Sequence, residues 1–344
     1  MAAGAITHGA PRPAPSARRI SDRIPTRSNM KIPLLILIES VHDFLPAIED
    51  RGFRCILATT PEQRARAIRE HADEIRVVLT RGATGFHADE MAALPKLELI
   101  CSLGVGFENI DVAAARARGL RVTHGPGANA TSVADHAMAL LLGTARHLPQ
   151  ADAWVRQGHW NGFMGPQVSG KRLGILGLGT IGLEIARRGA LGFGMTVGYY
   201  NRRPRPQSGY TYYDSPLALA AESDFLVVAT PGGADTRHLV NAAVLDALGP
   251  QGYLVNIARG SVVDTEALIA ALAERRIAGA GLDVVEGEPV VPPALFTLDN
   301  VVLTPHSAGR SPEAVSATVA LFLENATAHF GGKPVLTPVP GSLG

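Results

Sequence analysis

A glycine-rich turn near the middle of the chain has the spacing of a phosphate-binding loop. Its three glycines, at G-x-G-x-x-G spacing, are Gly177, Gly179 and Gly182. The first permits a tight turn after the apolar run 173–176, the second lets the backbone approach a pyrophosphate, and the third lets the following helix pack closely. That helix begins near Thr180, so the free peptide N–H groups of Thr180 and Ile181 can bind an anion. The turn therefore predicts a dinucleotide site.

The residues after the next strand bear on which dinucleotide is bound. NAD-binding folds normally place an Asp or Glu there for the ribose hydroxyls. This chain instead has Asn201, Arg202 and Arg203, and it has no acidic residue between Glu184 and Asp214. A neutral side chain and two cations suit a 2′-phosphate and leave nothing to repel it, so we expect NADP (NADPH) in preference to NAD. In the alternative interpretation, the asparagine is a turn residue, the arginines are solvated, and NAD is used.

Three residues suited to acid–base or carboxylate chemistry each follow a strand-like apolar run. They are Arg259, Glu288 and His306. The carboxyl ends of parallel strands meet at one edge of a sheet, where open α/β folds bind ligands. Taken singly, Arg259 could form a surface salt bridge and His306 could be a capping or core histidine, but together they indicate an active site. Glu286 is the alternative to Glu288 as the partner of His306.

The composition limits the class of protein and its partners. A chain of 344 residues, 46% of them hydrophobic, is long enough for two domains with buried cores. A formal net charge of +1 gives no reason to expect a nucleic acid or membrane partner, and no apolar run approaches the ~20 residues of a membrane span. The eleven histidines show no metal-ligand spacing, so no metal is expected. Cys55 and Cys101 lie in apolar runs and suit a reducing, cytoplasmic location.

Residues 1–29 differ from the rest of the chain. They contain five arginines, four prolines and a single acidic residue, Asp22. An arginine-containing, acid-poor leader is typical of a transit peptide, but the prolines would break the amphipathic helix that such a peptide needs. We therefore expect a disordered extension, with the ordered chain beginning at about Met30.

Alternating strand and helix patterns predict an α/β protein with parallel sheets. In the first half, strand-like runs lie at 31–38, 54–58, 77–79, 97–102 and 121–123, with helical patterns at 43–51, 61–71, 88–93 and 110–118. The second half begins with a long apolar helix at 132–148 and a loop that contains Trp154, Trp160 and Gly162. Six strands then follow at 172–177, 195–200, 225–229, 253–257, 279–283 and 301–304.

The strand count and the last helix together indicate the domain organisation. Six strands are typical of a doubly wound nucleotide domain. The last helix, at 312–329, must return to the first domain if the chain is to close compactly. We therefore expect a Rossmann domain with a doubly wound parallel sheet at 127–308, inserted in a flavodoxin-like substrate domain formed by 30–126 and 309–338. The chain would then cross from one domain to the other twice. These two crossings would form the hinge of a cleft, with the cofactor on one wall and the substrate between the domains.

Several ordered motifs resemble those of the D-isomer-specific 2-hydroxyacid dehydrogenase family. The segments that carry the resemblance are 102–111, 177–182, 256–260, 281–284, 288–289 and 304–306. The similarity runs from about residue 31 to residue 338. Within the family, the chain most resembles the NADPH-dependent glyoxylate/hydroxypyruvate reductases, including the hydroxyphenylpyruvate reductase type. The resemblance implies a homodimer built on the nucleotide domain and on the helix after the first crossing.

The resemblance also implies roles for individual residues in the reduction of a 2-keto acid. Arg259 would hold the carboxylate and polarise the ketone, and the peptide N–H groups of Val105 and Gly106 would bind the other end of the carboxylate. His306 would donate a proton to the carbonyl oxygen as hydride arrives from the nicotinamide. Glu288 would orient the imidazole and favour its charged form.

The cofactor site implied by the resemblance extends beyond the glycine-rich turn. It adds Thr131, Thr230, Pro231, Ala258, Asp283 and His306 to Gly177, Gly179, Thr180, Ile181, Gly182, Asn201, Arg202 and Arg203. The expected substrates are glyoxylate and hydroxypyruvate, which would be reduced to D-2-hydroxy acids.

Other functions fit the same fold. The chain could be an NAD-linked dehydrogenase, a hydroxyphenylpyruvate reductase or a 2-ketogluconate reductase. In a different class, the fold serves as a dinucleotide-sensing interaction module in corepressors. Trp154 and Trp160 are expected to pack a loop or a dimer contact, with substrate binding as the alternative.

Overall fold

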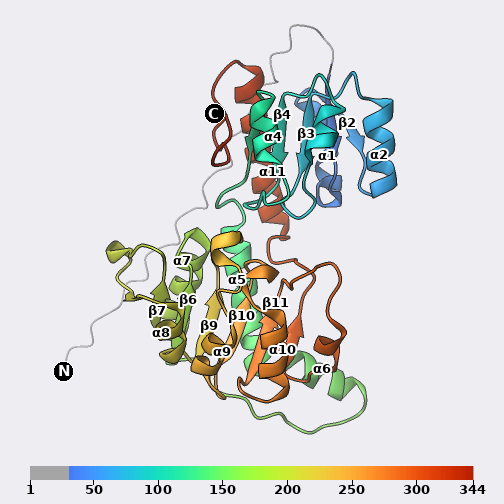
Figure 1. Cartoon of the computed structure of the whole chain (residues 1–344). Coiled ribbons are helices and arrows are strands. Elements are labelled where there is room, and N and C mark those ends of the chain that lie inside the picture. The colour runs from blue at the N-terminus through green and yellow to red at the C-terminus, as the bar shows by residue number, and fades with distance from the viewer. Residues whose placement is uncertain (1–30, 344) are drawn as a thin grey trace, which may run out of the picture.

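The computed structural model describes residues 31–343. The predicted disordered extension lies outside the described residues. Within them, a five-stranded and a seven-stranded parallel sheet form two lobes, each with helices on its faces (Figure 1). The predicted fold class, two parallel α/β sheets with a Rossmann-type unit, is confirmed. None of the described helices is long and apolar enough to cross a membrane.

The first sheet has the strand order β2-β1-β3-β4-β5, which is the flavodoxin-like order. Its strands are β1 (Ile32–Ile36), β2 (Phe53–Leu57), β3 (Val77–Thr80), β4 (Leu99–Ser102) and β5 (Arg121–Thr123). Its helices are α1 (Leu45–Asp50), α2 (Pro61–Glu70), α3 (Ala88–Ala92) and α4 (Val112–Ala117). The central strands are apolar runs because helices or loops cover both faces of the sheet.

The C-terminal helix α11 (Pro312–Phe330) packs on the first sheet, far from its neighbours in sequence (Figure 1). Phe322 and Leu323 share a core cluster with Ile32. Ser311 is the N-cap of the helix, since its Oγ accepts a hydrogen bond from Ala314 N at 3.1 Å. The chain after α11 continues along the same sheet as far as residue 343, beyond the predicted limit at residue 338.

The second sheet has the strand order β12-β11-β10-β9-β6-β7-β8. Its strands are β6 (Arg172–Leu176), β7 (Thr196–Tyr200), β8 (Thr211–Tyr213), β9 (Phe225–Val228), β10 (Tyr253–Asn256), β11 (Gly279–Leu282) and β12 (Val301–Leu303). Its helices are α5 (Ala130–Ala145), α6 (Leu148–Arg156), α7 (Thr180–Arg187), α8 (Pro216–Ala221), α9 (Ala242–Leu248) and α10 (Thr265–Ala273). The strand order reverses between β6 and β9, which is where such sheets bind nucleotides.

Two local predictions for the second sheet were wrong. Its strand count is seven rather than six, because β8 pairs with β7 at the sheet edge. This strand is three residues long and partly exposed, so it lacks the apolar run that marks the others. Trp154 was expected in a loop, but it lies in α6. That helix shows no buried residues, so its pattern has no apolar face directed into the core.

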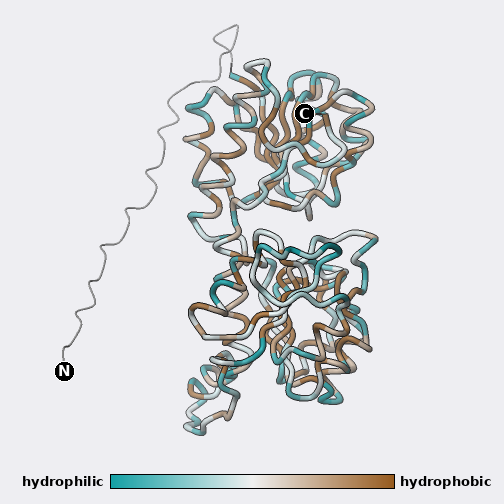
Figure 2. Tube along the Cα trace, turned by 90° about the vertical axis from the view of Figure 1, so that its left-hand side faces the viewer, coloured by the Kyte–Doolittle hydropathy of each residue, from teal (hydrophilic) through white to brown (hydrophobic). Residues whose placement is uncertain are grey.

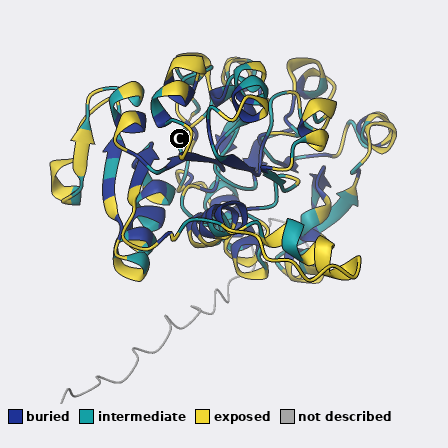
Figure 3. Cartoon of the chain, turned by 90° about the horizontal axis from the view of Figure 1, so that it is seen from below, coloured by how far each residue is buried: buried dark blue, intermediate teal, exposed yellow. Residues whose placement is uncertain are grey.

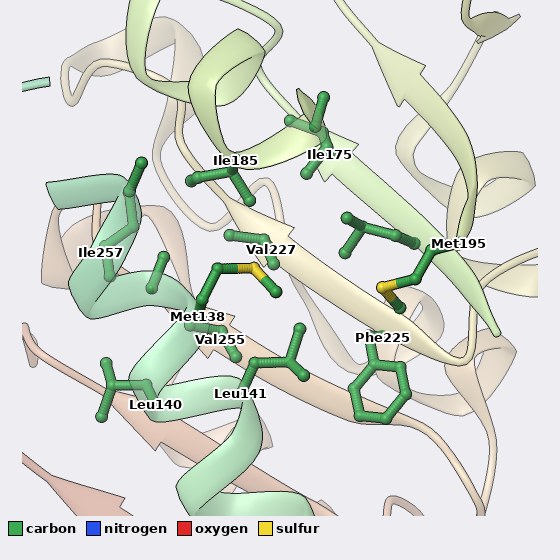
Figure 4. Packing of buried hydrophobic residues seen from close by; sticks show 14 of the residues in the cluster. Met138, Leu140, Leu141, Ile175, Ile185, Met195, Phe225, Val227, Val255 and Ile257 are labelled. Carbon is green, nitrogen blue, oxygen red and sulfur yellow. The ribbon is translucent and has the colours of Figure 1, made fainter. Parts of the chain in front are cut away.

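Apolar residues fill the space between the second sheet and the helices α5 and α7. Met138 and Leu141 of α5 lie over Val227 and Phe225, and Ile185 of α7 closes the same cluster (Figure 4). Hydrophobic segments run through the middle of each lobe (Figure 2). In the view along the sheets, buried strands lie inside helices whose outer sides are exposed (Figure 3).

The two segments that cross between the sheets lie side by side. Ser132 Oγ at the start of α5 donates a hydrogen bond to Ala308 O at 2.7 Å. Gly309 lies against Asn129 so closely that a Cβ atom would meet the Asn129 amide. These contacts hold the two crossings together between the lobes.

Candidate active site

A pocket of about 980 Å³ lies at the carboxyl edge of the second sheet, where the strand order reverses. Its walls are the segments that follow β6, β7 and β9. The predicted cofactor residues that line it are Gly177, Gly179, Thr180, Ile181, Asn201, Arg202, Arg203, Thr230 and Pro231. The pocket therefore has the position and the lining expected of a dinucleotide site.

The glycine-rich turn has the geometry that a pyrophosphate needs. Gly177 has φ of 105°, and a Cβ atom there would lie 2.7 Å from Thr230 N. Gly182 is buried, and a Cβ atom there would strike the Gly177 carbonyl. Gly179 is the N-cap of α7, has no side-chain cap, and has open space where a Cβ atom would project. The residues present thus fit a phosphate group at the positive end of the helix.

The end of the pocket after β7 is mostly cationic. Asn201 Oδ1 accepts a hydrogen bond from Leu178 N at 2.7 Å, so this side chain braces the turn. Arg205 lines the pocket together with Arg202 and Arg203. The expectation that nothing would repel a phosphate was wrong, because Asp235 also lines the pocket and pairs with Arg202 at 3.2 Å. The aspartate lies 33 residues further along the chain, so local sequence could not place it.

A second pocket, of about 520 Å³, lies between the two sheets. It brings together Arg259 after β10, Glu288 after β11 and His306 after β12. Val105 and Ile181 line both pockets, so the two spaces adjoin. A substrate in the second pocket would therefore meet the cofactor pocket directly.

His306 pairs with the carboxylate that the sequence motif favoured. Its Nδ1 lies 2.6 Å from Glu288 Oε1, and a carboxylate accepts hydrogen bonds, so Nδ1 carries the proton. Nε2 has no hydrogen-bond partner among the described residues. Glu286 binds Arg237 at 2.8 Å and His238 at 3.1 Å instead. Only Glu288 of the two glutamates is therefore in contact with His306.

Asp283 fixes the backbone on either side of His306. His306 has φ of 49°, in the left-handed region that non-glycine residues seldom adopt. His306 N donates to Asp283 O at 2.8 Å, while Ser307 N and Ala308 N donate to the Asp283 carboxylate at 2.8 and 3.0 Å. Burial raises the pKa of Asp283, but hydrogen bonds from His136, Thr304 and these amides outweigh it and lower the pKa to about 2.

Arg259 forms an ion pair with Glu108, which follows β4 of the first sheet. Burial raises the pKa of Glu108, but the neighbouring guanidinium of Arg259 more than offsets it, so the pKa is lowered. Within the described residues, the peptide N–H groups of Val105 and Gly106 donate no hydrogen bond, and both residues line the second pocket. A guanidinium and two open amides suit a carboxylate ligand.

The structure does not bring every predicted residue to a pocket. Thr131 is exposed on α5 and Ala258 is buried, and neither lines either pocket. Sequence reasoning in turn missed Glu108, Asp235, Arg81 and Arg310. Glu108 lay inside a recognised motif, but its contact with a residue 151 positions away has no local signal. Among the described residues, no group of three or more His, Cys, Asp or Glu side chains could hold a metal ion.

Comparisons with known proteins identify the family of the chain. Residues 138–308 match the NAD binding domain of the D-isomer specific 2-hydroxyacid dehydrogenases. The chain is 42% identical to hydroxyphenylpyruvate reductase of Plectranthus scutellarioides, over 84% of this chain and 93% of the relative. It is 41% identical to a glyoxylate/hydroxypyruvate reductase of Arabidopsis thaliana, with the same coverage.

A solved structure of a related enzyme has the same fold as this chain. The NADPH-dependent glyoxylate/hydroxypyruvate reductase of Sinorhizobium meliloti, in complex with NADP and malonate, superposes with a TM-score of 0.78 at 39% identity. The match covers 90% of this chain and 97% of that one. The chain therefore belongs to the D-isomer specific 2-hydroxyacid dehydrogenase family and is an NAD(P)-dependent oxidoreductase.

Proposed function

We propose that this protein reduces small 2-keto acids, with glyoxylate and hydroxypyruvate as substrates, to D-2-hydroxy acids, with NADPH as the preferred hydride donor. The observation that carries the proposal is the pairing of His306 with Glu288 in a pocket that also holds Arg259 and adjoins the dinucleotide pocket. A proton donor, a carboxylate anchor and a cofactor site are the three parts that the reduction needs.

A dinucleotide held at Gly179 and Thr180 would supply the hydride that reduces the carbonyl carbon of the substrate. Arg259 binds the substrate carboxylate through its guanidinium, and the open amides of Val105 and Gly106 bind the same group. His306 then donates the proton on Nε2 to the carbonyl oxygen, so that the product is a neutral alcohol. Glu288 holds the imidazole by Nδ1, which leaves Nε2 for the substrate.

The preference for NADPH rests on the three arginines at one end of the dinucleotide pocket. Asp235 opposes them, so we expect a preference rather than complete exclusion of NADH. The NADP complex of the Sinorhizobium meliloti enzyme supports this choice.

An activity panel tests the proposal. NADPH and NADH oxidation would be followed with glyoxylate, hydroxypyruvate and hydroxyphenylpyruvate, and with hydroxyacetone as a ketone without a carboxylate. We expect turnover of the two small acids with NADPH in preference to NADH, a D-configured product from hydroxypyruvate, and no turnover of hydroxyacetone, since Arg259 would lose its partner. Turnover of the plain ketone at the same rate would overturn the role of Arg259.

Hydroxyphenylpyruvate is the second candidate substrate. The 520 Å³ pocket exceeds the needs of a two-carbon acid and falls within the range that holds larger ligands, and the Plectranthus scutellarioides relative bears this activity in its name. A tenfold higher kcat/KM for the aromatic acid would assign the protein to this function instead.

We also propose that the protein is a homodimer. The apolar side chains that α6 and the loop after it leave exposed are Leu148, Trp154, Val155, Trp160, Phe163 and Met164. Trp160 and Met164 are 87% and 97% exposed, and a cluster of this kind is typical of an interface. We expect light scattering to give twice the chain mass of 36.1 kDa, and Met164→Lys combined with Trp160→Glu to give the mass of a single chain. A monomeric wild type would contradict the proposal.

A further inference from the structure

Two charged side chains around the second pocket have no ion-pair partner among the described residues. The charged or titratable side chains that line it are Arg81, Arg259, Asp283, Glu288, His306 and Arg310. Arg259 is paired with Glu108, His306 with Glu288, and the Asp283 carboxylate accepts several hydrogen bonds. Two arginines, Arg81 and Arg310, are left over.

Arg81 forms one side-chain hydrogen bond and no ion pair among the described residues. It directly follows β3, at the carboxyl edge of the first sheet, and it is half-buried. Its one side-chain hydrogen bond among the described residues runs from Nε to Thr84 Oγ1 at 3.2 Å, which leaves the two terminal nitrogens of the guanidinium without a partner. The contact with Thr84 therefore fixes Nε and leaves the terminal nitrogens available to an acceptor.

Arg310 belongs to the second crossing, just before the N-cap of α11. It is exposed, and it forms no ion pair in the part of the chain that the structure describes. The pKa of Arg81 is lowered by burial and then by the neighbouring charge of Arg310, while Glu288 and Glu39 raise it. Two like charges that share one pocket repel each other unless an anion lies between them.

We propose that Arg81 and Arg310 form a second anion subsite, so that the substrates include 2-keto acids with a second negative group at the far end of the chain. This inference rests on the proposed reduction of 2-keto acids and names a substrate class for it. Arg259 binds the carboxylate next to the ketone, and the two other arginines bind the distal carboxylate. The ketone still receives a hydride at carbon and a proton at oxygen, and the distal anion is unchanged.

Steady-state kinetics with a pair of substrates tests the subsite. 2-Ketoglutarate and 2-ketovalerate have the same chain length and differ in whether a carboxylate or a methyl group ends it. The readout is the ratio of their kcat/KM values with NADPH. For the wild type we expect a ratio of at least about ten, which falls as salt is added because the charges are open to solvent. In Arg81→Gln and in Arg310→Gln the ratio should fall toward one.

Matched controls separate the subsite from general effects. Arg69→Gln removes an exposed arginine of α2 that lines neither pocket, and it should keep the wild-type ratio. 5-Hydroxy-2-ketovalerate has a neutral polar group at the end of its chain. Its kcat/KM with the wild type should be well below that of 2-ketoglutarate. A melting curve and NADPH binding establish that each variant is folded.

The outcomes also separate this inference from the proposed function. The subsite is overturned if the kcat/KM ratio of 2-ketoglutarate to 2-ketovalerate is one or less in the wild type. It is also overturned if Arg81→Gln and Arg310→Gln both leave this ratio unchanged, even if glyoxylate is reduced. Equal use of the neutral hydroxylated substrate would mean that the arginines bind hydroxyl groups, and it would also overturn the assignment. Failure to reduce glyoxylate, hydroxypyruvate and both test acids would instead overturn the reduction itself.

Discussion

At the scale of single residues, the candidate chemistry depends on one contact between His306 and Glu288. The carboxylate holds Nδ1 at 2.6 Å, and this leaves Nε2 for a substrate. The pair thus fixes the orientation of the imidazole and places a carboxylate beside it.

Glu288→Gln tests the charge of this contact. Glutamine can still accept a hydrogen bond from Nδ1, but it carries no negative charge. Because a hydrogen bond to a charged group is typically worth about 1.5–3 kcal/mol, we expect kcat for hydroxypyruvate to fall by about ten- to a hundredfold with little change in KM. Steady-state kinetics is the measurement, and a variant with the wild-type kcat would show that the charge of Glu288 does not contribute.

Residues at the phosphate end of the dinucleotide pocket should control the choice of cofactor. Arg202→Ala and Arg203→Ala should each lower kcat/KM with NADPH by about ten- to a hundredfold and change it little with NADH, since each removes a charge-assisted contact. Asp235→Asn should act in the opposite direction, because it removes a like charge from the phosphate. Arg187→Ala, an exposed site on α7, is the control. Equal losses with both cofactors would refute the 2′-phosphate assignment.

At the scale of elements, the end of β11 fixes the loop that carries His306. The buried Asp283 carboxylate accepts hydrogen bonds from two amides after His306, and its pKa is lowered to about 2 from the ordinary 3.8. Because the folded-state pKa is the lower one, its contribution to stability is fully present above about pH 4 and is lost as pH falls through about 2. The shift corresponds to about 2 kcal/mol.

Asp283→Asn should lower the free energy of unfolding by about 2 kcal/mol at pH 7. The difference from the wild type should shrink as pH falls below about 4, since protonation then removes the same charge from the native protein. Urea unfolding at pH 7, 4 and 3 would measure it, with the exposed Asp73→Asn as control. If the difference in unfolding free energy between the wild type and Asp283→Asn is the same at all three pH values, the charged Asp283 carboxylate does not stabilise the fold.

Elements were predictable from sequence wherever burial imposes a pattern. The strands β6 and β10 and the long helices α5 and α11 have continuous apolar runs or faces, and their predicted ranges agree with the structure to within a few residues. The short edge strand β8 has no such run, and hydrogen bonds to β7 alone make it a strand. Edge elements of this kind depend on tertiary contacts rather than on local sequence.

At the scale of the whole molecule, the second pocket exists because the two sheets face each other. Its lining comes from the carboxyl ends of both sheets and from the crossings between them. Motif spacing indicated that Arg259, Glu288 and His306 lie at one edge. It could not indicate that Glu108 pairs with Arg259, or that Arg81 and Arg310 line the same pocket, because these residues lie far apart in the sequence. Long-range ion pairs leave no periodic signal in the sequence.

We propose that His306 donates the proton in the reduction of a 2-keto acid. The most direct test is kcat for hydroxypyruvate in the wild type and in His306→Gln, with NADPH affinity measured in parallel by fluorescence. We expect kcat to fall by about 10²–10⁴ while NADPH affinity stays close to that of the wild type. A variant that keeps the wild-type kcat would contradict this role of His306, because proton transfer would then come from another group.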